Sequence, residues 1–145
     1  MLAEDVKNAL TKAMVAKESE RVLALRMIVA SLHNEKIAKR RDLSDDEAIE
    51  VLKRELKKCE EALGIYKNAG RSDKAKEEEM GIEVIKSFLP EALSEEELKT
   101  IVDRVFKDAG ESPRFGDVMK LVMAEAKGRG DGAKISSIIK ERLSP

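Results

Sequence analysis

The chain has 145 residues, of which 42% are hydrophobic and 39% are charged, and this allows one ordinary domain or two small ones. Aromatic residues make up only 3% and tryptophan is absent, so the core must come from aliphatic side chains and methionine, which favours helices. The net charge of −1 excludes a bulk polycation, so any nucleic-acid binding must come from a local basic patch.

Cysteine content and hydropathy indicate the compartment. The single cysteine, Cys59, excludes an internal disulfide and fits a reducing environment. We interpret it as a small core hydrophobe rather than a nucleophile, because the chain has one histidine and Cys59 has no partner nearby in the sequence. No apolar run approaches the ~20 residues of a membrane span, and the first residues lack the apolar core of a signal peptide. We therefore expect a soluble cytoplasmic protein without a membrane partner.

Helical periodicity begins at the second residue. A first helix is predicted from apolar residues that share one face: Leu2, Val6, Ala9, Leu10, Ala13 and Met14. Ser19 is a candidate cap for a second helix, which is apolar nearly all round its middle and should be the most buried element of the first half. Residues 20–41 contain six basic and two acidic side chains, and the basic ones gather at the end of this helix: Lys36, Lys39, Arg40 and Arg41.

A capping box predicts the start of a third helix. Ser44 and Glu47 have the spacing of that motif, and Leu43 is placed to act as a hydrophobic staple. Gly70 should end the helix, and Ser72 should cap a fourth. Steps of three and four along the third helix give an apolar seam for packing against other helices: Ile49, Leu52, Leu56, Cys59, Leu63 and Tyr66.

The segment PEALSEEEL, which starts at Pro90, marks a domain boundary. Proline stops the fourth helix, and Ser94 with Glu97 forms a second capping box that starts a fifth, which Gly110 closes. A sixth and a seventh helix come after it, and no β alternation appears. We expect an all-α fold with an N-terminal four-helix domain over residues 1–90 and a small three-helix tail module over residues 91–145.

No catalytic residue, metal site or cofactor is predicted. One histidine and one cysteine cannot build a Cys/His zinc centre. The acidic runs at residues 45–47 and 95–97 lie at helix starts, where acids more often compensate the helix dipole than bind Mg²⁺. His33 lies on an apolar helix, and we interpret it as a helix-surface or interhelical residue.

The stretch KGRGDGAKIS, residues 127–136, has three glycines that permit positive φ and close backbone approach: Gly128, Gly130 and Gly132. Its spacing fits neither a P-loop nor a dinucleotide-binding fingerprint. Free N–H groups at the next helix start could bind a phosphate, with Arg129 and Lys134 as charge partners. Alternatively, the stretch is a plain turn in which Asp131 already caps the last helix, and the pattern favours this second interpretation.

Two sets of basic residues are candidates for RNA binding. The segment between them, residues 91–111, holds seven acids and three bases, so charge is segregated along the chain. The cluster that ends the second helix is one candidate patch. The other surrounds the glycine turn and contains Lys120, Lys127, Arg129, Lys134, Lys140 and Arg142.

Several segments carry a family resemblance, and they occur in order over essentially the whole chain. They read LRMIVASLHNEKI, LKRELKKCEEALGIYKNAGRSDKAKEEEMGIEVIKSFLP, LSEEEL and GDVMKLVMAEAKGRGDGAKISSIIKERL. Together they resemble the YqeY-like proteins, which are related to the tail region of the B subunit of the tRNA-dependent Asp/Glu-tRNA amidotransferase (GatB). The chain departs from the family pattern at Gly130, where alanine is usual, at Phe88, and at Lys74, where an apolar anchor is usual.

The resemblance implies an all-helical N-terminal domain and a three-helix GatB/YqeY tail module. In the amidotransferase, the corresponding tail contacts the tRNA body, while ATP-dependent activation and amide transfer occur in a separate cradle domain. A label of carbon–nitrogen ligase with glutamine as amido donor would therefore describe the relatives, since no catalytic machinery is visible in this chain.

Three functions are compatible with the sequence. The first is a non-catalytic accessory protein that binds tRNA through its C-terminal module. The second is a subunit or relative of a glutamine-dependent tRNA amidotransferase that acts only with partner chains. The third is a helical protein–protein adaptor. The candidate partners are accordingly tRNA and subunits of an amidotransferase or an aminoacyl-tRNA synthetase.

Overall fold

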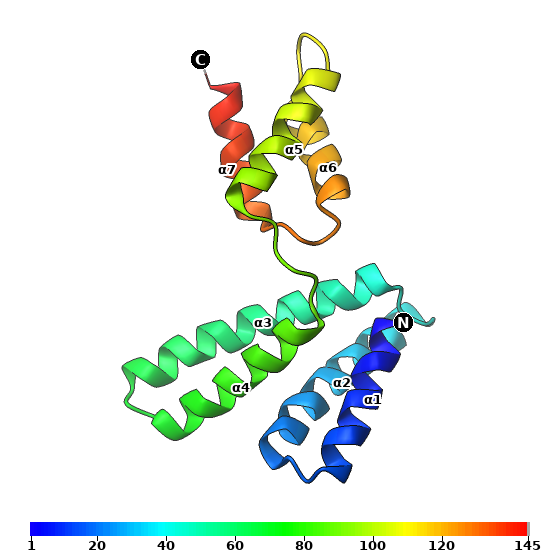
Figure 1. The fold of residues 1–145 in the computed structure, drawn as a ribbon, viewed down its shortest axis with the longest axis vertical. Coiled ribbons are helices and arrows are strands. Elements are labelled where there is room, and N and C mark those ends of the chain that lie inside the picture. Colours follow the sequence, from blue (N-terminus) through cyan, green and yellow to red (C-terminus); the bar gives the residue numbers. More distant parts are fainter. Residues whose placement is uncertain (145) are drawn as a thin grey trace. The chain divides into compact units, whose positions relative to one another are not determined.

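The computed structural model describes residues 1–144, and within that range the chain forms seven α-helices and no strand (Figure 1). The all-α prediction is therefore confirmed. In chain order the helices are α1 (Leu2–Val15), α2 (Ser19–Lys39), α3 (Asp45–Asn68), α4 (Ser72–Phe88), α5 (Glu95–Asp108), α6 (Phe115–Ala126) and α7 (Gly132–Leu143).

The helices gather into two compact units with separate cores. The first unit spans Met1–Leu89 and contains α1 to α4, and the second spans Pro90–Pro145 and contains α5 to α7. No helix within residues 1–144 combines the length and the apolar character that crossing a membrane requires.

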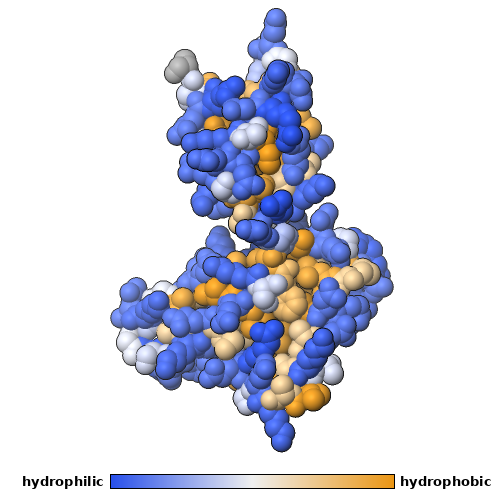
Figure 2. All heavy atoms as spheres, in the orientation of Figure 1, coloured by the Kyte–Doolittle hydropathy of each residue, from blue (hydrophilic) through white to orange (hydrophobic). Residues whose placement is uncertain are grey.

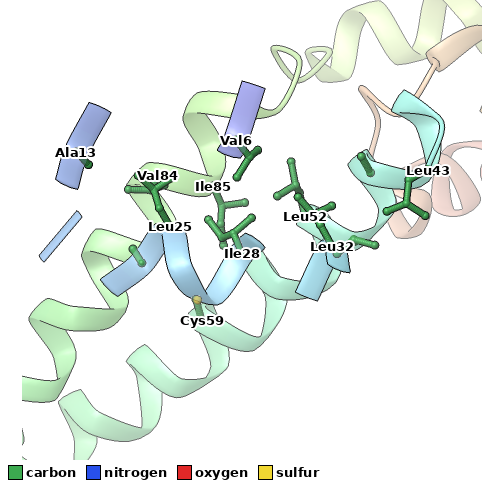
Figure 3. Packing of buried hydrophobic residues seen from close by; sticks show 13 residues of the cluster. Val6, Ala13, Leu25, Ile28, Leu32, Leu43, Leu52, Cys59, Val84 and Ile85 are labelled. Carbon is green, nitrogen blue, oxygen red and sulfur yellow. The ribbon is translucent and has the colours of Figure 1, made fainter. Parts of the chain in front are cut away.

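The first unit is built from two helical hairpins, α1–α2 and α3–α4, which pack on each other mainly through α2. Figure 3 shows the aliphatic side chains that meet between them. Leu25 and Ile28 of α2, Leu52 of α3 and Ile85 of α4 are fully buried. Aliphatic side chains therefore supply this core, as the near absence of aromatic residues predicts.

Helix α2 is less uniformly buried than its composition predicts. One face is covered, but Leu23 is 61% exposed, Met27 is 39% exposed and Ile37 is also exposed. The expectation that it is the most buried element of the first half was wrong: four of its 21 residues are buried, against five of 24 in α3 and four of 17 in α4, because the two hairpins cover only part of its circumference. Figure 2 shows apolar side chains of this unit exposed between α4 and the α1–α2 hairpin.

Two of the four predicted serine caps are confirmed. Ser44 Oγ accepts the Glu47 N–H at 3.2 Å, and Ser94 Oγ accepts the Glu97 N–H at 3.1 Å, each within a complete capping box. Ser19 and Ser72 do not cap α2 and α4, because each is already the first helical residue. A hydroxyl inside the helix lies past the position from which it can accept a free N–H of the first turn.

Glycines end two helices as predicted. Gly70 follows α3 with φ +70°, and Gly110 follows α5 with φ +85°. In this left-handed region a side chain is costly, so glycine is the usual residue after a helix end.

The second unit has a compact core of aliphatic side chains from three helices. Its buried residues are Leu98, Val102 and Val105 of α5, Val118, Val122 and Ala126 of α6, and Ile135 and Ile139 of α7. Each pair among the three helices is in contact. The core is small, because short helices bury little surface, and each of its members therefore matters to the stability of the unit.

Candidate nucleic-acid interface

The glycine turn between α6 and α7 is shaped by backbone conformation and close packing. Lys127 and Gly128 both adopt positive φ, of 48° and 76°, which ends α6. Gly130 is buried, and a Cβ added there would lie 2.9 Å from Ile135 Cδ1 and 3.0 Å from Leu98 Cδ2. Gly132 has neither feature: its φ is not positive, and no atom would lie within 4 Å of an added Cβ.

Asp131 occupies the N-terminus of α7. It is the N-cap residue, and its Oδ1 accepts the Ala133 N–H at 2.9 Å. A carboxylate at this position satisfies a free donor and compensates the positive end of the helix dipole. The arrangement matches the plain-turn interpretation, because an incoming phosphate would have to displace or approach this carboxylate.

Arg129 connects the turn to the segment that precedes α5. Its Nε donates to the Glu91 carbonyl oxygen at 2.9 Å, and its own carbonyl accepts the Leu93 N–H at 2.7 Å. Its charge also helps to lower the pKa of Glu97, although hydrogen bonds from Ser94 are the larger cause. Arg129 therefore has a structural role in the second unit, whatever else it contacts.

Two of the other candidate cations on α7 face different neighbours. Arg142 forms an ion pair with Asp103 of α5 and lies 5.4 Å from the centre of the Phe106 ring. Lys140 lies 5.9 Å from the centre of the Phe115 ring, at the start of α6. Residues two apart on a helix point in different directions, so the six predicted residues do not share one face.

Four of the lysines have no acidic partner. Within residues 1–144, no carboxylate oxygen lies within 4.0 Å of the ammonium groups of Lys120, Lys127, Lys134 and Lys140. All four side chains are exposed on α6, on α7 or on the turn that joins them. We call these four the free lysines of the second unit; Lys107 also has no acid within 4.0 Å in the described part of the chain, but it lies on α5 and is not counted with them.

The basic cluster at the end of α2 is, in contrast, largely neutralised. Lys36 pairs with Asp42 at 2.9 Å, and Lys39 pairs with Glu47 at 3.0 Å. Arg41 forms a bidentate ion pair with the same Glu47: its Nη1 lies 2.6 Å from Oε1 and its Nη2 lies 2.8 Å from Oε2. Of this cluster only Arg40, the left-handed residue after α2, has no acid within 4.0 Å in the described part of the chain.

The pKa values of the acids in this cluster respond to these contacts. The hydrogen bond from Arg41 is the largest cause that holds the pKa of Glu47 far below its usual value, followed by the Ser44 N–H and Lys39. The hydrogen bond from Lys36 likewise lowers the pKa of Asp42. The carboxylates therefore stay charged at neutral pH and compete with any phosphate for these cations.

Cys59 has the environment of a core residue. It is 3% exposed, and burial is the first cause that raises the pKa of its thiol to about 12, followed by a hydrogen bond with Glu78. The protonated thiol is a poor nucleophile at neutral pH. No group of three or more histidine, cysteine, aspartate or glutamate residues within the described range is arranged to hold a metal ion.

Sequence reasoning missed the pairing of Arg41 with Glu47. The two residues lie six positions apart, on either side of a turn, so no helical spacing connects them. The capping box is the one available signal, since it fixes the Glu47 side chain at the start of α3, next to the chain that leaves α2.

Comparison with known proteins identifies a family to which the chain is similar. The sequence model of the family described as Yqey-like protein matches residues 3–143. No curated protein matches the chain.

Proposed function

Because the chain belongs to the YqeY-like protein family, we propose that it is a non-catalytic accessory protein that binds tRNA through the helices of its second unit. The similarity of the family to the tail of an amidotransferase subunit, noted from the sequence, motivates the choice of tRNA. We take residues 1–90 and 91–145 as two domains and assign RNA binding to the second. The proposal places the protein in the cytoplasm, where its single thiol stays reduced.

The free lysines of the second unit carry the proposal. An ammonium group without an acidic partner can bind a phosphate without first losing an ion pair. The second unit offers four such groups on two adjacent helices and their turn: Lys120, Lys127, Lys134 and Lys140.

The surroundings of Lys140 add an aromatic surface. Phe115 is 37% exposed, and Lys140 lies over its ring. Exposed aromatic rings beside cations are common where proteins contact unpaired nucleotides, because a base can stack on the ring while the cation meets the backbone. This pair lies on the same two helices as the other free lysines and extends the candidate surface.

Mobility shifts of the full chain with tRNA at low and moderate salt test the proposal. Affinity should fall steeply with added salt, with a log–log slope of about −3 for four phosphate contacts. A variant with Lys120, Lys127, Lys134 and Lys140 all changed to glutamine should lose most of the affinity at low salt.

A matched variant controls for net charge. Changing Lys36, Lys39, Arg40 and Arg41 to glutamine removes the same formal charge from the cluster that is already paired, so affinity should fall far less. Circular dichroism confirms that each variant is folded. Absence of tRNA binding at low salt, or an equal loss in the two variants, would contradict the proposal.

A further inference from the structure

A hollow between α2 and α4 in the first unit has no role in the proposed function. It measures about 470 Å³ and runs along both helices for about two turns. Its α2 wall carries Glu20, Leu23 and Met27, which share one helical face, and its α4 wall runs from Asp73 to Gly81. From Glu20 to Met27 the α2 wall spans about 10 Å, and we call this hollow the groove.

Small residues form the floor of this groove. Ala24 comes from α2, Cys59 from α3 and Gly81 from α4. A Cβ added at Gly81 would lie 3.2 Å from Cys59 Sγ, so the missing side chain lets α4 approach α3 closely. The groove exists because these three side chains do not fill the space between the hairpins.

The walls are apolar and adaptable. Leu23 and Met27 are exposed to solvent, and Met80 is half-buried on the opposite wall. Methionine side chains are flexible and polarisable, and they are common where a surface must adapt to apolar side chains of a partner. Exposed apolar side chains that line a groove indicate a binding site more strongly than scattered ones do.

The rim is acidic. Four carboxylates line the groove against one cation, Lys76: Glu20, Asp73, Glu77 and Glu78. Asp73 and Glu77 each have a basic neighbour on or just before α4. Glu20 and Glu78 have no basic nitrogen within 4.0 Å in the described part of the chain, so no ion pair neutralises them, although Glu78 also has a hydrogen bond with the Cys59 thiol.

From this combination we infer that the groove binds an amphipathic helix of a partner protein that carries lysine or arginine beside its apolar face. Apolar side chains at positions i, i+3, i+4 and i+7 would contact Leu23, Met27 and Met80 over the two turns available. Basic residues beside that stripe would face Glu20 and Glu78.

The same charge argues against RNA as the occupant. The unpaired carboxylates of Glu20 and Glu78 would repel a phosphate backbone, whereas they would attract a basic helix. The inference therefore does not rest on the proposed function. The free lysines belong to the second unit and the groove to the first, so each surface can fail its own test while the other passes.

A labelled synthetic helix provides the probe. The full chain is titrated with a fluorescein-labelled amphipathic peptide of leucine and lysine, and binding is followed by fluorescence anisotropy. Two matched peptides serve as controls, one with glutamate in place of lysine and one with the same composition in scrambled order. The lysine peptide should bind at least about tenfold more tightly than either, because charge match and the apolar stripe are both needed.

Methionine methyl signals locate the binding. The chain has six methionines, and the signals of Met27 and Met80 should shift when the lysine peptide is added. Those of Met119 and Met123, on α6, should not. Signals that stay unchanged at Met27 and Met80 would overturn the inference even if the peptide binds elsewhere.

Matched variants complete the test. Leu23→Gln should weaken binding by at least about tenfold, because it removes an apolar side chain that the partner would bury and adds no charge. Ile65→Gln changes a residue of similar exposure in the same unit outside the groove and should have no effect. The double variant Glu20→Lys with Glu78→Lys should reverse the preference between the lysine and glutamate peptides.

Several outcomes would overturn the inference. One is lack of binding by the lysine peptide, and another is equal weakening by Leu23→Gln and Ile65→Gln. A third is a dependence of the Met27 and Met80 signals on protein concentration without peptide, because that would make a second copy of the chain the occupant of the groove.

Discussion

Two clusters of basic residues in this chain look alike in the sequence and differ in the structure. The cluster at the end of α2 meets acids from the adjoining turn and from the start of α3, so three of its four cations are paired. The cations of α6 and α7 meet few acids, so four lysines remain free. Counting charges along the chain therefore overestimates the charge that α2 can offer to a polyanion.

The difference arises from the acids at the start of the next helix. Acids that begin a helix compensate its dipole, and here Glu47 also completes a capping box that fixes its side chain beside the end of α2. The start of α7 has one acid, Asp131, and its carboxylate accepts the Ala133 N–H of the same helix. The position of a carboxylate that is held in place therefore determines which nearby cations remain unpaired.

The largest expected effect is a loss of stability that distinguishes Arg129 from the free lysines of the second unit. Arg129→Met should destabilise the second unit by about 2 kcal/mol, because the charged hydrogen bond to the Glu91 carbonyl is lost. Lys134→Met should change stability by no more than about 0.5 kcal/mol. Native-state hydrogen exchange of the α5 and α7 amides measures both values, and equal effects would remove the distinction.

The next effect is a gain in RNA affinity, expected when the cluster at the end of α2 loses its acidic partner Glu47 and Arg41 becomes unpaired like the free lysines. Glu47→Gln keeps the acceptor for the Ser44 N–H, frees Arg41 and leaves Lys39 with only the longer contact to Glu35, at 4.0 Å. Affinity for a short RNA near 0.1 M salt should rise about tenfold, as expected when at least one cation becomes available to a phosphate. Filter binding beside the wild type measures the change, and unchanged affinity would show that pairing does not limit this cluster.

The same substitution has a pH signature. The pKa of Glu47 is lowered in the folded chain, so its contribution to stability is present above its ordinary pKa of 4.5 and is lost as pH falls through the lowered folded value. The wild type should therefore be more stable than Glu47→Gln at pH 7, and the difference should shrink in strong acid. Urea unfolding at pH 7 and pH 3 tests the sign, and a gap that widens in acid would refute it.

The smallest effects come from the two capping boxes. Ser44→Ala and Ser94→Ala should each destabilise their unit by about 1 kcal/mol, because each removes a cap acceptor. Neither should raise RNA affinity, since Ser44→Ala leaves the pairing of Arg41 with Glu47 in place. A rise in affinity for Ser44→Ala would mean that the cap, rather than the carboxylate, holds the cluster in its paired state.

Local signals predicted much of the fold. The boxes at Ser44 and Ser94 and the helix ends at Gly70 and Gly110 depend on interactions within a few residues, and all four are confirmed. Ser19 shows the limit, because a residue with the right chemistry can lie one position inside a helix whose start is set by the preceding turn.

Properties that depend on distant neighbours were not predictable. The exposure of Leu23 depends on how far apart two hairpins lie, and the burial of Glu55 depends on which face of α3 is covered. The predicted seam of α3 included Leu52 and Cys59, which are buried, but it omitted Val51 and Ala48, which are buried as well. Likewise, no spacing rule could show that Arg129 contacts Glu91, 38 residues away.

The bonds between Arg129 and the segment before α5 also determine where the chain can be cut. A fragment that begins at Ser94 contains all of α5, α6 and α7, yet it lacks the Glu91 carbonyl and the Leu93 N–H that hold the turn. Trimming to the helix boundary would thus leave the turn before α7 unsupported. A fragment that begins at Pro90, where the second unit starts, retains both bonds.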